Sequence, residues 1–121
     1  MRTLGWNCQG IGKTLGSPKI CHLARMVVST NAQVVFLSEV KSSKFSPADI
    51  STRFNVSDAF VVPSRKSSGG LWLMWSDDVL LDVHTSTFHL ILATVVDKSR
   101  NLKFGLVCMY GDPYHHQTAS I

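Results

Sequence analysis

The sequence predicts an α/β fold built on a mixed, mainly antiparallel sheet, and two observations support this prediction. The first forty residues read as a strand, a helix and a second strand. From Val56 onward, short apolar runs alternate with Ser, Gly and Asp, a pattern typical of strands joined by turns. A chain of 121 residues is long enough to bury one core, and this length makes two independent domains implausible, so residues 1–121 are predicted to form a single domain.

The opening segment predicts a strand followed by a helix. Residues 3–6 read as a short strand that ends in a glycine-containing loop over residues 7–13. Ser17 and Pro18 are a typical N-cap and first helical residue. Apolar residues at helical spacing then continue the helix to about residues 30–31.

A continuous apolar run over residues 34–39 predicts a second strand that is buried on both faces. The resulting strand–helix–strand order resembles a βαβ unit, in which the two strands are parallel. Asn7 follows the first strand and Glu39 ends the second. Both are therefore predicted to lie at the carboxyl edge of the sheet, where open α/β sheets bind ligands.

The rest of the chain predicts one more helix and five strands. Ser46 and Pro47 repeat the N-cap and proline signal and begin a short helix that ends near Phe54. The apolar runs that follow predict strands over residues 59–62, 70–75, 79–83, 88–96 and 102–110. The last two are expected to form an antiparallel hairpin around the polar turn between them.

Charge is distributed unevenly along the chain. Residues 1–66 hold nine Lys and Arg against three acidic residues, whereas residues 67–121 hold three against five. The net charge of +4 fits a polyanionic partner such as nucleic acid, and it fits a solvated basic surface equally well.

Three cysteines without a CxxC pair indicate a reducing compartment. The N-terminus lacks the apolar stretch of a secretory signal, and no apolar run is long enough to cross a membrane. We therefore expect a soluble, intracellular protein with no membrane partner.

Asn7, Glu39 and Tyr110 are the candidate site residues. A carboxylate at a buried sheet edge needs a metal, a cation or several donors, and one carboxylate with one amide oxygen suits Mg²⁺. Tyr110 ends the last predicted strand and could direct its phenol to a phosphate oxygen. Three plainer interpretations stay open: Asn7 forms a turn, Glu39 pairs with Lys41, and Tyr110 packs against the core. The adjacent pair His115-His116 is not expected to bind one metal, because neighbouring residues of an extended segment point to opposite sides.

Four segments, taken together, resemble a known superfamily. They are WNCQG at residues 6–10, VFLSEVK at 35–41, SGGLWLMW at 68–75 and VCMYG at 107–111. Their order and spacing resemble the endonuclease/exonuclease/phosphatase superfamily, and are most similar to the apurinic-like endonuclease domain of plant LINE-type non-LTR retrotransposons. The resemblance implies the N-terminal half of a DNase I-like four-layer α/β sandwich, with helices on one face of the sheet.

The resemblance also implies roles for the three candidate residues. Asn7 matches a residue that helps to bind metal and phosphate, and Glu39 matches a ligand of Mg²⁺, which Mn²⁺ could replace. Tyr110 matches a tyrosine that approaches the scissile phosphate. DNA or another phosphodiester is the implied substrate, and the nucleus is the implied location.

Members of that superfamily are longer, and their second half carries Gly-Asp-x-Asn and Ser-Asp-His segments that do not occur here. Because general acid–base groups contribute orders of magnitude in rate, we expect this chain to hydrolyse phosphodiesters little or not at all. The resemblance further implies that the second half supplies most of a second sheet. We therefore expect an uncovered apolar face, including some of Leu71, Leu73, Leu90 and Leu92, through which the chain could self-associate.

Two other hypotheses remain open at this point. The chain could be a non-catalytic module that binds nucleic acid or protein, with Trp6 and Phe45 available for stacking if they are exposed. It could also be a degenerate product with no selected activity.

Overall fold

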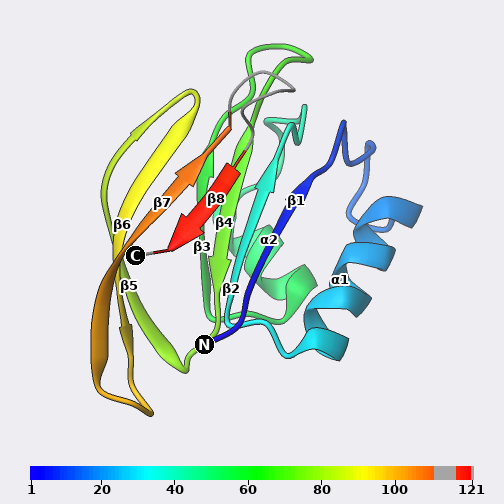
Figure 1. Ribbon diagram of the computed structural model, residues 1–121. Coiled ribbons are helices and arrows are strands. Elements are labelled where there is room, and N and C mark those ends of the chain that lie inside the picture. Colours follow the sequence, from blue (N-terminus) through cyan, green and yellow to red (C-terminus); the bar gives the residue numbers. More distant parts are fainter. Residues whose placement is uncertain (111–116, 121) are drawn as a thin grey trace.

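Two four-stranded sheets lie face to face, and two helices cover the outer face of the first sheet in the described part of the chain (Figure 1). The computed structural model describes residues 1–110 and 117–120, the last four by their backbone alone. The helices are α1 (Pro18–Thr30) and α2 (Pro47–Phe54). The first sheet has the order β1 (Thr3–Asn7), β2 (Val34–Ser38), β4 (Leu71–Trp75), β3 (Asp58–Val62). The second sheet has the order β5 (Val79–Thr87), β6 (Leu90–Asp97), β7 (Leu102–Met109), β8 (Gln117–Ser120).

Local sequence signals define both helices, as predicted. The Ser17 hydroxyl caps α1 by accepting the Ile20 N–H, and Asn31 ends the helix in the left-handed conformation with φ 53°. In α2 the Ser46 hydroxyl accepts the Asp49 N–H at 3.1 Å, and the Asp49 carboxylate accepts the Ser46 N–H at 3.3 Å. This reciprocal capping box satisfies two backbone donors that a helix of eight residues would otherwise leave unpaired.

The first sheet is mixed because β1 and β2 are parallel while β4 is antiparallel to both β2 and β3. The helix α1 connects β1 to β2, so the predicted strand–helix–strand unit is confirmed. All five residues of β2 are buried, in agreement with the unbroken apolar run. One face packs on the helices through Val35, Leu37, Trp72 and Met74. The other face packs on the second sheet through Val34, Phe36, Leu71 and Leu73.

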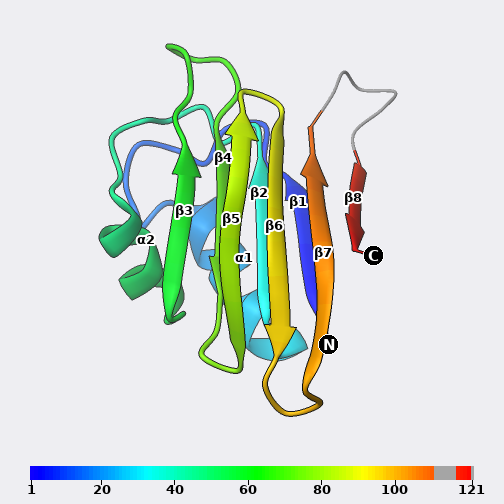
Figure 2. The same cartoon turned by 90° about the vertical axis from the view of Figure 1, so that its left-hand side faces the viewer.

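Four strands of this chain form the second sheet, which Figure 2 shows in front of the first. The predicted hairpin is the β6–β7 pair. Two features differ from the prediction: β5 continues to Thr87 past an irregularity in its pairing, and β8 was not foreseen. The expectation of an uncovered face is wrong for Leu71 and Leu73, which have 0% exposed surface because β6 and β7 lie across them.

Apolar side chains on the other face of the second sheet are more accessible. Leu80 of β5 is 57% exposed and Met109 of β7 is 48% exposed, whereas Leu90 and Leu92 are half-buried. The described helices all lie on the far side of the first sheet (Figure 1). Neither of them is long and apolar enough to span a membrane.

Candidate active site at the carboxyl edge of the parallel strands

The parallel pairing of β1 and β2 brings Asn7 and Glu39 to the same edge of the first sheet. Asn7 is in register with Ser38, the residue before Glu39. The two loops that follow these strands stay joined by backbone hydrogen bonds from Cys8 N–H to the Ser38 carbonyl at 2.8 Å and from Gly10 N–H to the Glu39 carbonyl at 2.7 Å. The juxtaposition that the sequence predicted is therefore present, and both side chains are half-buried.

The backbone around Glu39 is held in an unusual conformation. Glu39 and Lys41 have φ angles of 49° and 57°, in the left-handed region that residues other than glycine rarely adopt. Hydrogen bonds fix this shape, because Val40 N–H donates to the Gly70 carbonyl at 3.2 Å and Lys41 N–H donates to the Gly69 carbonyl at 2.7 Å. A non-glycine residue in this region costs about 1 to 2 kcal/mol, so the surrounding loops must impose it.

Asn7 lies at the carboxyl edge of the first sheet and also forms part of a turn. Its side-chain oxygen accepts the Gln9 N–H at 3.3 Å, which is the turn-forming role that the residue type favours. The Lys19 ammonium donates to the Cys8 carbonyl at 2.5 Å and brings a positive charge to the same loop. The loop that carries Asn7 is thus tied to both α1 and the strand end that carries Glu39.

Tyr110 reaches the same end of the molecule from the second sheet. The arrowheads of β2 and β7 point to one end of the two sheets (Figure 1), and Tyr110 follows β7 directly. Its N–H donates to the His89 carbonyl at 2.7 Å, and its ring stacks on the His89 ring with centroids 6.2 Å apart. Tyr110 is half-buried against the core between the sheets, so the packing role is present too.

A row of four side chains, which we call the rim stack, connects Tyr110 with the loop beside Glu39. Its members are Arg65, Phe88, His89 and Tyr110. The Phe88 and His89 rings meet edge-on, with their centroids 5.1 Å apart. The Arg65 guanidinium lies over the Phe88 ring, 4.2 Å from its centroid. The same ring lies over Gly69, where an added Cβ would stand 2.2 Å from it. Because Gly69 accepts the hydrogen bond of Lys41, the rim stack and the Glu39 loop are braced against each other.

Cys8 directly follows Asn7, and the structure makes its thiol a poor nucleophile. Burial raises the pKa of Cys8 to about 12, against a smaller lowering by Lys19, and the Glu39 carboxylate adds to the increase. A thiol with such a pKa stays protonated at neutral pH. Cys8 is therefore a packing residue beneath the site.

The donor types at the edge fit a hard cation such as Mg²⁺. Glu39 offers a half-buried carboxylate, and Asn7 offers an amide oxygen on the adjacent strand. Larger metal clusters do not occur: within the described residues no three His, Cys, Asp or Glu side chains gather where they could hold an ion. The pair His115-His116 lies outside the described residues.

The two aromatic residues considered for stacking have different surroundings. Trp6 is 39% exposed on β1 and meets the His22 ring of α1 edge-on at 6.2 Å, so one side of it is accessible. Phe45 is half-buried and packs edge-on against the buried Trp72 at 6.0 Å. The condition of exposure is met less well by Phe45 than by Trp6, because the Phe45 ring packs against the core of the first sheet.

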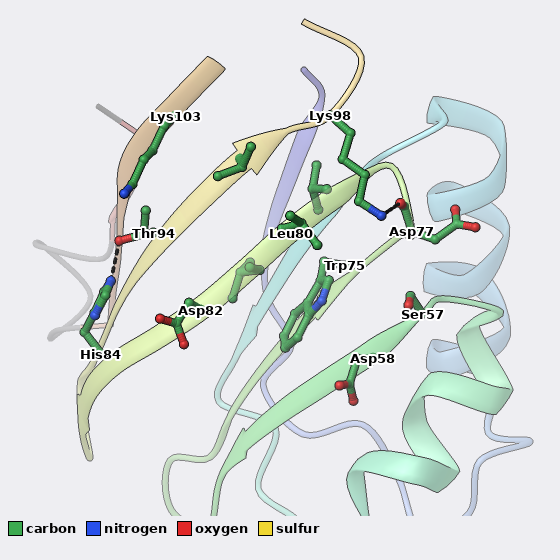
Figure 3. A pocket seen from close by; sticks show the side chains of 13 residues that line it. Ser57, Asp58, Trp75, Asp77, Leu80, Asp82, His84, Thr94, Lys98 and Lys103 are labelled. Atoms are coloured by element: carbon green, nitrogen blue, oxygen red, sulfur yellow. Dashed lines mark hydrogen bonds between the residues drawn. The ribbon is translucent and has the colours of Figure 1, made fainter. Parts of the chain in front are cut away.

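A hollow of about 400 Å³ lies at the opposite end of the molecule, where β3 begins and β4 ends (Figure 3). Asp58, Asp77 and Asp82 line it together with Lys98 and Lys103. The Lys98 ammonium donates to the Asp77 carbonyl at 2.7 Å, and a hydrogen bond joins His84 to Thr94. Sequence reasoning did not find this hollow, because its residues come from five strands and turns and share no motif.

Comparison with solved structures relates this architecture to a nuclease. The chain is similar to the crystal structure of AP endonuclease LMAP from Leishmania major, with a TM-score of 0.61 and 13% sequence identity. The fold is of the DNase I-like type. The match covers 88% of this chain and 38% of the endonuclease, so the chain spans well under half of that protein. No protein-family profile matches the sequence, and no curated protein matches it.

The DNase I-like fold agrees with the architecture that the motif order implied, including two facing sheets with helices on one side. Sequence reasoning missed the other three members of the rim stack, of which His89 contacts Tyr110 and Phe88 contacts both His89 and Arg65. A weak signal existed, since Phe88 and His89 directly precede β6, which pairs with β7, and Tyr110 directly follows β7. Nothing in the sequence pointed to Arg65, which reaches Phe88 from a separate loop.

Proposed function

We propose that this chain belongs to a Mg²⁺-dependent nuclease that hydrolyses phosphodiester bonds of DNA. The observation that carries the proposal is the meeting of Asn7 and the Glu39 loop at the carboxyl edge of a parallel strand pair, within a DNase I-like fold. Tyr110 stands at the same end of the molecule. A carboxylate, an amide and a phenol at one end of the two sheets suit a metal-bound phosphate and offer little to an uncharged substrate.

In this proposal each residue has a distinct task. Glu39 and Asn7 hold the metal through oxygen atoms, and the hydrogen bonds of their loops keep these atoms in place. The Tyr110 phenol donates to a non-bridging oxygen of the scissile phosphate and so orients it. A bound Mg²⁺ would supply charge stabilisation to the phosphoryl group. Mn²⁺ would serve the same ligands, because it also prefers oxygen donors.

We further propose a retrotransposon origin and a nuclear site of action, on the strength of the four ordered sequence segments. The proposal includes low activity for residues 1–121 alone. Glu39 is the only glutamate of the chain, and the described acids of the hollow stand at the opposite end of the molecule from it. The Gly-Asp-x-Asn and Ser-Asp-His segments of the superfamily do not occur in the sequence, and a general acid or base of the kind they carry contributes about 10²- to 10⁴-fold in rate.

A plasmid-nicking assay tests the proposal. Supercoiled DNA is incubated with the chain in Mg²⁺, in Mn²⁺ and in EDTA, and the wild type is compared with Glu39→Ala. We expect slow nicking that needs the metal and disappears in Glu39→Ala. Asp58→Ala, which removes one carboxylate at the opposite end, is the matched control and should nick like the wild type. Equal nicking by wild type and Glu39→Ala would remove Glu39 from the mechanism.

A second candidate is a non-catalytic module that binds nucleic acid. It is favoured by the exposed basic side chains near the site, Arg65 and Lys66 among them, which would bind phosphates whether or not hydrolysis follows. Binding without any metal-dependent nicking would support this candidate. Absence of binding even at low salt would exclude it.

A further inference from the structure

Arg65, the first member of the rim stack, is an exposed arginine on a rigid turn. The turn is closed by hydrogen bonds from Arg65 N–H to the Ser68 carbonyl at 2.8 Å and from Ser68 N–H to the Arg65 carbonyl at 3.0 Å. Lys66 completes it with a left-handed φ of 56°. Because the two ends of the turn are hydrogen-bonded to each other, the backbone of Arg65 is restrained, and a bound ligand would not have to order it.

The side chain of Arg65 is positioned as well as its backbone. The guanidinium lies 4.2 Å from the centroid of the Phe88 ring, and that ring in turn sits on the buried Gly69. An aromatic ring that contacts the face of a guanidinium leaves its N–H edge available for bidentate hydrogen bonds. Arg65 is therefore a preorganised donor for a planar or tetrahedral oxyanion. A phosphate can accept two parallel hydrogen bonds from the N–H groups of the Arg65 guanidinium.

The position of Arg65 relative to Tyr110 suggests what carries this phosphate. From Arg65 the rim stack passes through Phe88 and His89 to Tyr110 in steps of 4.2, 5.1 and 6.2 Å. Phosphates of one DNA strand follow one another about every 3.4 Å along the helix axis, so the rim stack is no longer than a few nucleotides. Lys66 adds a second exposed cation beside Arg65.

We propose that Arg65 binds a backbone phosphate of the nucleic acid strand that runs along the rim stack, a few nucleotides from the phosphate held at Tyr110. The inference rests on the proposed function only for the position of the scissile phosphate. Phe88 acts as a positioning residue that holds the guanidinium, and Gly69 leaves room for its ring. The contact is to the backbone, so it does not select a base sequence.

The test is the salt dependence of binding to a fluorescein-labelled 20-base-pair DNA duplex, followed by anisotropy in EDTA between about 50 and 200 mM salt. Arg65→Gln is compared with Arg100→Gln, a matched change of an exposed arginine in the β6–β7 turn at the opposite end of the molecule. We expect the slope of log K against log salt to fall by about 0.9 in Arg65→Gln and to stay unchanged in Arg100→Gln. Arg65→Lys should retain the slope, and Phe88→Leu should weaken binding although no charge is lost.

Equal slopes and affinities for Arg65→Gln and Arg100→Gln would overturn the inference, because the contribution of an arginine to DNA binding would then not depend on its position in the structure. Absence of wild-type binding at about 50 mM salt would overturn it as well. The same titration with an RNA duplex of that sequence tells which nucleic acid is bound more tightly. Since these measurements need no hydrolysis, a failed nicking assay refutes the proposed nuclease and leaves the Arg65 contact standing.

Discussion

Replacing Gly69 by alanine should cost stability mainly through Phe88. An added Cβ would stand 2.2 Å from the Phe88 ring and within 3 Å of two further ring atoms, so the ring must swing away. Gly69 also has a φ of 71°, which an alanine tolerates poorly. Both effects arise in the folded state, and they can be separated by removing the ring.

The magnitudes follow from the contacts that are lost. The left-handed backbone costs about 1 to 2 kcal/mol for a residue with a Cβ. Displacing the ring forfeits the Arg65 contact, worth about 0.5 to 1 kcal/mol at an exposed site, and about 1 kcal/mol of apolar burial for a half-buried side chain. Gly69→Ala should therefore reduce the free energy of unfolding by about 3 kcal/mol, a large part of the stability of a small domain.

A double-mutant cycle measured by urea unfolding, with tryptophan fluorescence as the signal, checks this reasoning. In a Phe88→Ala background the ring is absent, so Gly69→Ala should cost only the backbone component of about 1 to 2 kcal/mol. The difference between the two backgrounds is the coupling energy. An equal cost of Gly69→Ala in both backgrounds would refute the proposed packing of Phe88 on Gly69.

Two further predictions concern the second sheet. The Ser99 hydroxyl, assisted by the backbone N–H groups of Ser99 and Arg100, lowers the pKa of Asp97 below its usual 3.8. The ionised carboxylate therefore stabilises the fold above about pH 4, and this stabilisation is lost as the pH falls through the pKa that Asp97 has in the folded protein. Asp97→Asn should flatten the change in urea midpoint between about pH 6 and pH 3, and an unchanged profile would contradict the hydrogen-bonded role. The exposed Leu80 and Met109 predict concentration-dependent self-association in sedimentation velocity, which Leu80→Gln combined with Met109→Gln should reduce. A wild type that stays monomeric at high concentration would argue against it.

Much of the first sheet and its helices could be predicted because their signals are local. Ser17 with Pro18, and Ser46 with Pro47, cap their own helices, so a few neighbouring residues contain the whole interaction. The buried run of β2 likewise reports its own environment. The position of Asn7 and Glu39 at one edge then follows from the connection between two parallel strands.

The expectation for Leu71 and Leu73 failed because it concerned packing between distant segments. Their strand was identified correctly, but what covers it is a sheet formed later in the chain. The apolar residues of a strand indicate that a face of its sheet is apolar, but they do not indicate which segment of the chain covers that face. The roles of Asn7, Glu39 and Tyr110 in metal and phosphate binding remain predictions that the nicking assay addresses.

The α/β class, both helices and the strand ends that carry the candidate site follow from the sequence alone, since each depends on interactions within a few residues or on one short connection. The left-handed backbone at Glu39, the packing of Phe88 on Gly69 and the contact of Arg65 with the Phe88 ring depend on the tertiary structure. Those features require loops from both sheets to meet at one end of the molecule. Contacts of that kind are fixed by the packing of the whole domain, and a local pattern in the sequence does not encode them.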